Sequence, residues 1–136
     1  MSKTHRAAVV GAGAWGTALA ALLAKRGHDV TLWSFEPEVA DAVNQRHENP
    51  YLDGADLPEQ LRATTSLADC LSGASLIVSV SPSQFVRSVM SEAAPHVAAD
   101  ALVVSASKGL ELSSLLRMDE VLDQILPASV MDRFCV

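Results

Sequence analysis

The sequence predicts an α/β protein with a doubly wound, mainly parallel sheet that is covered by helices on both faces. Two observations support this fold class. Short apolar runs alternate with segments of helical periodicity, and a glycine-rich turn follows the first apolar run. Strands that alternate with helices form βαβ units, whose right-handed crossovers produce a parallel sheet. Ligands of such sheets bind outside the carboxyl ends of the strands, so the loops after the strands are the candidates for function.

The first half of the chain shows the alternation clearly. The predicted elements are a strand over 7–10, a helix over 14–26, a strand over 29–33, a helix over 38–46, a loop over 47–58, a short strand over 62–63 and a short helix over 67–71. Gly27 suits the position after a helix C-terminus, and Pro37 suits the first turn of the next helix. Val39 and Val43 lie four residues apart, which places them on one helix face.

The second half continues the same pattern. It is predicted to contain a strand over 75–80, a helix that starts at Pro82, a strand over 101–106, and a final amphipathic helix marked by Leu115, Leu116, Leu122, Ile125 and Leu126. In the helix after Pro82, one face is expected to carry Phe85, Val86, Val89 and Met90. The last residues, 133–136, read as a strand that is only beginning. We therefore expect a fragment that stops near the start of a sixth strand.

Composition limits the possible functions. The chain has 136 residues, of which 49% are hydrophobic and 19% charged, and this predicts one compact domain over residues 1–136. A net charge of −6 argues against a nucleic-acid partner, which needs a basic face. No stretch approaches the roughly 20 apolar residues of a membrane span, and no signal-peptide pattern is present. We therefore expect a cytoplasmic protein in which Cys70 and Cys135 are reduced, and the scattered histidines predict no metal site.

The motif "GAGAWG" follows the first strand, opens the first helix, and is followed by a second strand. In this context the spacing G-x-G-x-x-G indicates a dinucleotide-binding site of the Rossmann type, although the glycine pattern alone is a weak signal. Gly11 permits the tight turn, Gly13 lets the backbone approach a pyrophosphate, and Gly16 lets the helix pack close to the sheet. The phosphates would meet free N–H groups at the positive end of the helix dipole.

The end of the second strand bears on the choice between NAD and NADP. The usual acidic position falls near Ser34, which is neutral, and Phe35 and Glu36 follow it. Glu36 could accept a hydrogen bond from the adenosine ribose and would repel a 2′-phosphate. It could also be an ordinary acid in the first turn of a helix. We predict NAD as the cofactor, with NADP possible.

Two residues on later loops invite two interpretations each. Phe85 is either a core residue of its helix, which the residues alone favour, or a wall against the cofactor. Lys108, in "SASKGLE", is either a solvated loop lysine or a cation at the ligand-binding edge of the sheet. A lysine at that edge could receive an anion or take part in proton transfer, which makes a functional role the favoured interpretation.

Four segments together resemble the NAD(P)-dependent glycerol-3-phosphate dehydrogenases: "VVGAGAWGTALA", "NQRHENPYL", "SLIVSVSPSQFV" and "SASKGLE". The resemblance covers nearly the whole chain. With Glu36, it implies a cofactor site formed by Gly11, Ala12, Gly13, Ala14, Trp15, Gly16, Phe35, Phe85 and Lys108. Lys108 would also bind substrate beside the nicotinamide. Phe35-Glu36 is more like the NAD-preferring members, and Ala14 replaces a common Ser or Asn without loss of the backbone contact.

The resemblance also implies what the parent enzyme does. It would reduce dihydroxyacetone phosphate to glycerol 3-phosphate, a precursor of phospholipids, with a helical domain that carries the principal catalytic lysine. That domain is absent from this sequence, so we expect no main catalytic residue within it and an inactive fragment. The parent enzyme could be a homodimer, which the sequence does not determine. The alternatives are a related dehydrogenase of 3-hydroxy acids or ketopantoate, and an NAD-sensing module without chemistry.

Overall fold

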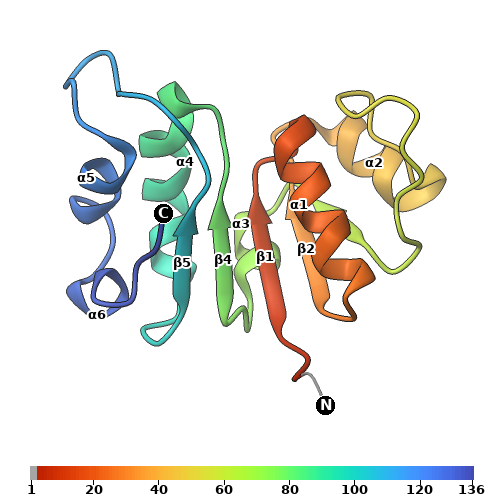
Figure 1. Cartoon of the computed structure of the whole chain (residues 1–136), viewed down its shortest axis with the longest axis horizontal. Coiled ribbons are helices and arrows are strands. Elements are labelled where there is room, and N and C mark those ends of the chain that lie inside the picture. The colour runs from red at the N-terminus through yellow and green to blue at the C-terminus, as the bar shows by residue number, and fades with distance from the viewer. Residues whose placement is uncertain (1–2) are drawn as a thin grey trace.

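The structure, a computed structural model, describes residues 3–136, so Met1 and Ser2 of the predicted domain lie outside the described residues. The described residues form a five-stranded sheet in the order β3-β2-β1-β4-β5. The strands are β1 (Arg6–Val10), β2 (Asp29–Trp33), β3 (Arg62–Thr64), β4 (Leu76–Ser79) and β5 (Leu102–Ser105). Every neighbouring pair is parallel, with β1 in the middle of the sheet (Figure 1). The predicted fold class is confirmed.

The strand register determines where a ligand can bind. Val10, the last residue of β1, pairs with Trp33 on one side and Ser79 on the other, and Ser79 pairs with Ser105. The carboxyl ends of the four strands therefore lie level. The direction of strand order reverses between β1 and β4, and the loops that follow these two strands diverge at that point. In sheets of this kind the reversal point is where ligands bind.

Alternate residues of the strands face two separate cores. Ala7 and Val9 of β1 belong to the core beneath α1 (Ala14–Lys25) and α2 (Pro37–Arg46). Ala8 and Val10 belong to the core on the other face, with α3 (Leu67–Leu71), α4 (Val86–Ala93), α5 (Met118–Asp123) and α6 (Ala128–Met131). Each fully buried aliphatic side chain stabilises the fold by about 1.5–3 kcal/mol. Burial on both faces explains why the strands are nearly continuous apolar runs.

The predicted final helix is wrong at both ends, because α5 spans only Met118–Asp123 and Ile125 and Leu126 lie beyond it. Leu115 has a left-handed backbone with φ 61° and is 69% exposed, and the helix α5 begins only at Met118. Residues 110–117 form a closed loop instead, because Leu110 and Arg117 pair as an antiparallel bridge. The Glu111 amide also donates to the Leu116 carbonyl over 2.9 Å. Leu116 still packs against the core, which is why the leucine spacing imitated a helix. The short helix α6 was not predicted.

The helix after Pro82 also differs from the prediction. Its first turn is a 3₁₀ segment, η1 (Ser83–Phe85), and a second one, η2 (Ala94–His96), follows α4. A 3₁₀ turn has about three residues per turn, so Phe85 falls out of phase with the α-helical face. Val86 and Met90 are fully buried, whereas Phe85 is 59% exposed. The core interpretation of Phe85 is therefore wrong.

The remaining elements agree with the predicted bounds to within one residue at each end. The strand expected at residues 133–136 appears as a single parallel bridge between Cys135 and Val104 on the free edge of β5. The Cys135 amide donates to Val103 O over 3.0 Å, and the Ser105 amide donates to Cys135 O over 2.9 Å. Figure 1 shows the C-terminus beside β5. No helix within residues 3–136 is long and apolar enough to cross a bilayer.

Candidate functional site

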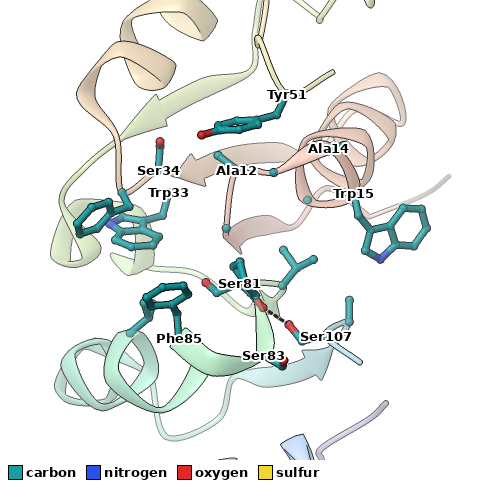
Figure 2. Close-up of a pocket in the computed structure, with 18 of the residues that line it drawn as sticks. Ala12, Ala14, Trp15, Trp33, Ser34, Tyr51, Ser81, Ser83, Phe85 and Ser107 are labelled. Carbon is teal, nitrogen blue, oxygen red and sulfur yellow. Dashed lines mark hydrogen bonds between the residues drawn. The ribbon is translucent and has the colours of Figure 1, made fainter. Parts of the chain in front are cut away.

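A cleft of about 1020 Å³ opens at the carboxyl edge of the sheet. Its walls are the loops after four strands, residues 11–16, 33–36, 80–83 and 106–108, together with Tyr51, Phe85, Ser88, Val89 and Glu92. Figure 2 shows Trp33 and Phe85 toward one end of the cleft and Trp15 toward the other. The cleft therefore lies at the position that strand order alone marks as a binding site.

The glycine loop has the geometry that its spacing predicts. Gly11 has φ 134°, and a Cβ there would lie 2.8 Å from the backbone of Val80 and Ser81. A Cβ on Gly16 would lie 2.0 Å from the carbonyl oxygen of Gly11, so only glycine lets α1 begin this close to β1. A Cβ on Gly13 would meet no atom within 4 Å among the described residues. Gly13 thus faces open space, where a ligand can approach the backbone.

The N-terminus of α1 points its first amides at this space. Gly13 is the N-cap residue, and within residues 3–136 no side chain caps the helix or places a carboxylate in its first turn. The N–H groups of an uncapped first turn have no intrahelical partner and carry the positive end of the helix dipole. An anion such as a pyrophosphate would satisfy these amides.

Asn49 holds the glycine loop from outside, a role that the sequence analysis missed. Its buried amide donates to the Ala12 carbonyl over 3.0 Å and to the Thr17 hydroxyl over 2.7 Å. The side-chain oxygen Oδ1 of Asn49 accepts from the backbone amide of Tyr51 over 2.9 Å. One side chain therefore joins the loop 47–58 to the cofactor loop. The only signal in the sequence was the segment "NQRHENPYL", which carries both Asn49 and Tyr51.

The end of β2 and the loop 47–58 form one end of the cleft. Phe35 is 82% exposed. The Ser34 hydroxyl accepts from the Glu36 amide over 3.1 Å, which holds the turn before α2. The Tyr51 hydroxyl donates to Glu36 Oε1 over 2.5 Å. This hydrogen bond raises the pKa of the phenol, because loss of the phenol proton would break the bond and leave two anions in contact. Figure 2 shows the Tyr51 ring near Ala12 of the glycine loop.

The other walls are tied together by two serines. The Ser81 hydroxyl donates to Val10 O over 3.1 Å, which joins the loops after β4 and β1. The Ser107 hydroxyl donates to Ser81 O over 2.5 Å, which joins the loops after β5 and β4 (Figure 2). Lys108, the residue after Ser107, is exposed at the rim. Among the described residues that line the cleft, Lys108 is the only lysine or arginine.

The structure brings every predicted site residue into this one cleft. The lining includes Gly11, Ala12, Gly13, Ala14, Trp15, Gly16, Phe35, Glu36, Phe85 and Lys108. It also includes Ser34, Tyr51, Ser81 and Ser107, for which no role was predicted. The strand order and the glycine-lined cleft place the chain in the class of dinucleotide-binding domains.

The particular family follows from the sequence. Residues 6–136 match the family model described as NAD-dependent glycerol-3-phosphate dehydrogenase N-terminus, so the chain belongs to that family. It is 48% identical to a glycerol-3-phosphate dehydrogenase [NAD(P)+] of Geobacter metallireducens over 94% of this chain and 38% of that relative. The chain thus spans less than two fifths of the length of this relative.

Solved structures agree with the family assignment. A glycerol-3-phosphate dehydrogenase of Coxiella burnetii is similar with a TM-score of 0.83 and 36% identity, over 90% of this chain and 38% of that one. A ketopantoate reductase of Ralstonia eutropha is more distant, with a TM-score of 0.71 and 25% identity, over 89% of this chain and 38% of that one. The resemblance found in the sequence is confirmed.

Proposed function

We propose that the chain is the NAD-binding part of an enzyme that interconverts dihydroxyacetone phosphate and sn-glycerol 3-phosphate. The observation that carries the proposal is the cleft itself. Its described lining combines a glycine loop at a helix N-terminus with one lysine, Lys108, from the loop after β5. When bound, the nicotinamide ring would supply or accept the hydride. The chain's own residues would bind the dinucleotide, orient it, and present a cation to the substrate.

The glycine loop fits a dinucleotide pyrophosphate. Gly11 and Gly16 have no room for a side chain, while the space at Gly13 is open toward the cleft. The uncapped amides of α1 would donate to the phosphate oxygens, and Trp15 would border the same region. Ala12 and Ala14 would contribute backbone only, which is why a side chain other than Ser or Asn is acceptable at position 14.

The end of the cleft at Phe35 and Glu36 suits an adenosine. The exposed ring of Phe35 can cover the adenine, and the Glu36 carboxylate can accept from a ribose hydroxyl. A 2′-phosphate would meet Glu36, and Lys108, the only cation on the described lining, lies on a different wall. These contacts support NAD as the preferred cofactor, with NADP as the weaker ligand.

Lys108 would lie at the nicotinamide and substrate end. The exposed ring of Phe85, which lies beside Trp33 (Figure 2), offers an apolar wall to the dinucleotide. The Lys108 ammonium can hold a substrate oxygen through a charge-assisted hydrogen bond. The main proton donor would belong to another part of the enzyme, as the family resemblance implies. The cytoplasmic location expected from the sequence stays a prediction.

The test is substrate turnover by the full-length protein. We expect NADH oxidation with dihydroxyacetone phosphate, and no comparable rate with ketopantoate or a 3-oxo acid. Turnover of ketopantoate alone would favour the second candidate, which the similarity to the Ralstonia eutropha ketopantoate reductase supports. NAD binding without turnover of any of these substrates would favour the sensing module.

A further inference from the structure

Lys108 lies on a loop that has an unusual backbone conformation at the next residue. It lies between Ser107 and Gly109, and Gly109 has φ 106°, a conformation that few other residues adopt. In the described part of the chain, residues 3–136, no salt bridge includes Lys108. A flexible side chain on a glycine-containing loop would sample many positions unless the loop itself were held.

The loop is held on the C-terminal side of Lys108 by Gln84. The Gln84 side-chain amide donates from Nε2 to Leu110 O over 2.9 Å and accepts at Oε1 from the Leu112 amide over 3.0 Å. The side chain thereby pairs with both backbone groups that flank Glu111, as a neighbouring strand would. Gln84 lies in η1, directly beside Ser83 and Phe85 of the cleft wall.

Glu111 provides a second attachment to the same segment. The Arg87 guanidinium donates to both carboxylate oxygens, from Nε over 2.8 Å to Oε2 and from Nη2 over 3.0 Å to Oε1. The Ser114 hydroxyl donates to Oε1 over 2.5 Å. The Glu111 side chain is only 7% exposed, so this bidentate pair is shielded on the carboxylate side. Bidentate pairs fix geometry as well as charge.

We propose that Gln84 and the Arg87–Glu111 pair are positioning residues that hold the Lys108 ammonium at a fixed place over the cleft. The inference rests on the proposed function, in which Lys108 contacts the substrate. Ser107 anchors the loop to Ser81 before the lysine, and Gln84 and Arg87 anchor it after the lysine.

These residues act without touching the ligand space. Among the described residues, Gln84, Arg87 and Glu111 are not part of the cleft lining. Their loss should therefore leave cofactor binding unchanged and weaken only the steps that need Lys108. Because preorganised groups lose efficiency steeply when they become mobile, we expect Gln84→Ala to lower kcat/KM for dihydroxyacetone phosphate by about tenfold. The dissociation constant of NADH should change by less than about twofold.

The experiment is a double-mutant cycle in the full-length enzyme with Gln84→Ala, Lys108→Ala and the double variant. If Gln84 acts through Lys108, Gln84→Ala has little further effect once Lys108 is removed, whereas a merely structural role gives additive losses. The matched control is Gln60→Ala. This change also removes a hydrogen bond from a glutamine side-chain amide to a backbone carbonyl, that of Ala24. Gln60→Ala should leave kcat/KM unchanged.

Hydrogen exchange supplies a readout that does not depend on turnover. In Gln84→Ala the Leu112 amide loses its acceptor, and exchange over residues 107–112 should rise by about tenfold or more while β5 stays protected. Gln84→Glu, which keeps the acceptor for Leu112, should restore part of the protection and of kcat/KM. Unchanged exchange, or additive losses in the cycle, overturns the inference. A Lys108→Ala enzyme with wild-type kinetics would instead refute the role of Lys108 in the proposed function.

Discussion

The Tyr51 hydroxyl donates a 2.5 Å hydrogen bond to Oε1 of Glu36, and both side chains line the same end of the cleft. The bond holds the carboxylate of Glu36 on the cleft wall and joins the loop 47–58 to the turn after β2. A carboxylate held in this way stands where a dinucleotide that carries a 2′-phosphate would be repelled. The proposed preference for NAD therefore rests on a pair of residues that lie 15 positions apart in the sequence.

Replacing Glu36 should change that choice. In the full-length enzyme, Glu36→Arg exchanges a repelling carboxylate for a guanidinium that can bind a phosphate. We expect the ratio of kcat/KM for NADPH over NADH to rise by about tenfold or more. The control is Glu38→Arg, which makes the same charge change on α2 at a residue outside the described lining of the cleft. An unchanged ratio in Glu36→Arg would exclude Glu36 as the discriminating residue.

Two glycines of the loop should respond differently to alanine. In Gly16→Ala the new Cβ would lie 2.0 Å from Gly11 O, so the free energy of unfolding should fall by about 3 kcal/mol. Gly13 has φ −72°, which alanine adopts readily, and its Cβ would meet no described atom within 4 Å. Gly13→Ala should therefore stay within about 0.5 kcal/mol of wild type yet bind NADH more weakly. Equal NADH affinity in Gly13→Ala would argue against close approach of a ligand there.

Removing the cation of the cleft should impair catalysis. We expect Lys108→Ala to lower kcat/KM for dihydroxyacetone phosphate by tenfold or more, which corresponds to about 1.4 kcal/mol or above. Lys25→Ala serves as the control because this exposed lysine lies in the last turn of α1, away from the cleft. Steady-state kinetics of both variants decide the matter, and a Lys108→Ala enzyme with wild-type kcat/KM would contradict a substrate contact.

The two cysteines should differ strongly in reactivity. Burial raises the pKa of the Cys70 thiol to about 12, whereas Cys135 is exposed. The thiolate is the reactive form, so iodoacetamide at pH 8 should modify Cys135 about 100-fold faster than Cys70. At pH 9 the Cys70 thiol is still almost entirely protonated, so Cys70 should remain the slower of the two sites. Peptide mass spectrometry measures both rates, and unfolding in urea should make them equal.

The Arg87–Glu111 pair should make the stability of the fold depend on pH in the acidic range. The Arg87 guanidinium, and then the Ser114 hydroxyl, hold the pKa of Glu111 below its usual range. The native state therefore favours the carboxylate, and its contribution to stability is present above about pH 4.3, the value for an unfolded chain, and is lost as the pH falls through the lower native pKa. Glu111→Gln should lower Tm at pH 7, and its difference from wild type should shrink toward pH 3.

Differential scanning fluorimetry across this pH range provides the measurement. Glu59→Gln is the control, since Glu59 is exposed and its replacement should leave Tm unchanged at every pH. A Tm difference between wild type and Glu111→Gln that stays constant from pH 7 to pH 3 would show that the ionised pair does not contribute.

The elements that the sequence predicted correctly are those that local rules control. The strand β2 and the helix α3 have the predicted bounds, because apolar runs and turn residues set them. The prediction of the final helix failed at its start. Leu115 and Leu116 follow helical spacing, but hydrogen bonds to Glu111 and the Leu110–Arg117 bridge hold the backbone there in a loop. The prediction that Phe85 is a core residue failed because a 3₁₀ turn changed the phase of the helix.

By itself the sequence determined the doubly wound sheet and the place of the cleft. The glycines, the alternation of strands and helices, and the position of Lys108 after a strand are patterns that each involve only a few neighbouring residues. Only the tertiary structure decided how the site is held. Asn49 reaches Ala12, Tyr51 reaches Glu36, and Gln84 reaches Leu110 across 37, 15 and 26 positions. Such polar contacts form only after the strands have brought distant loops to one edge, and no local pattern reports them.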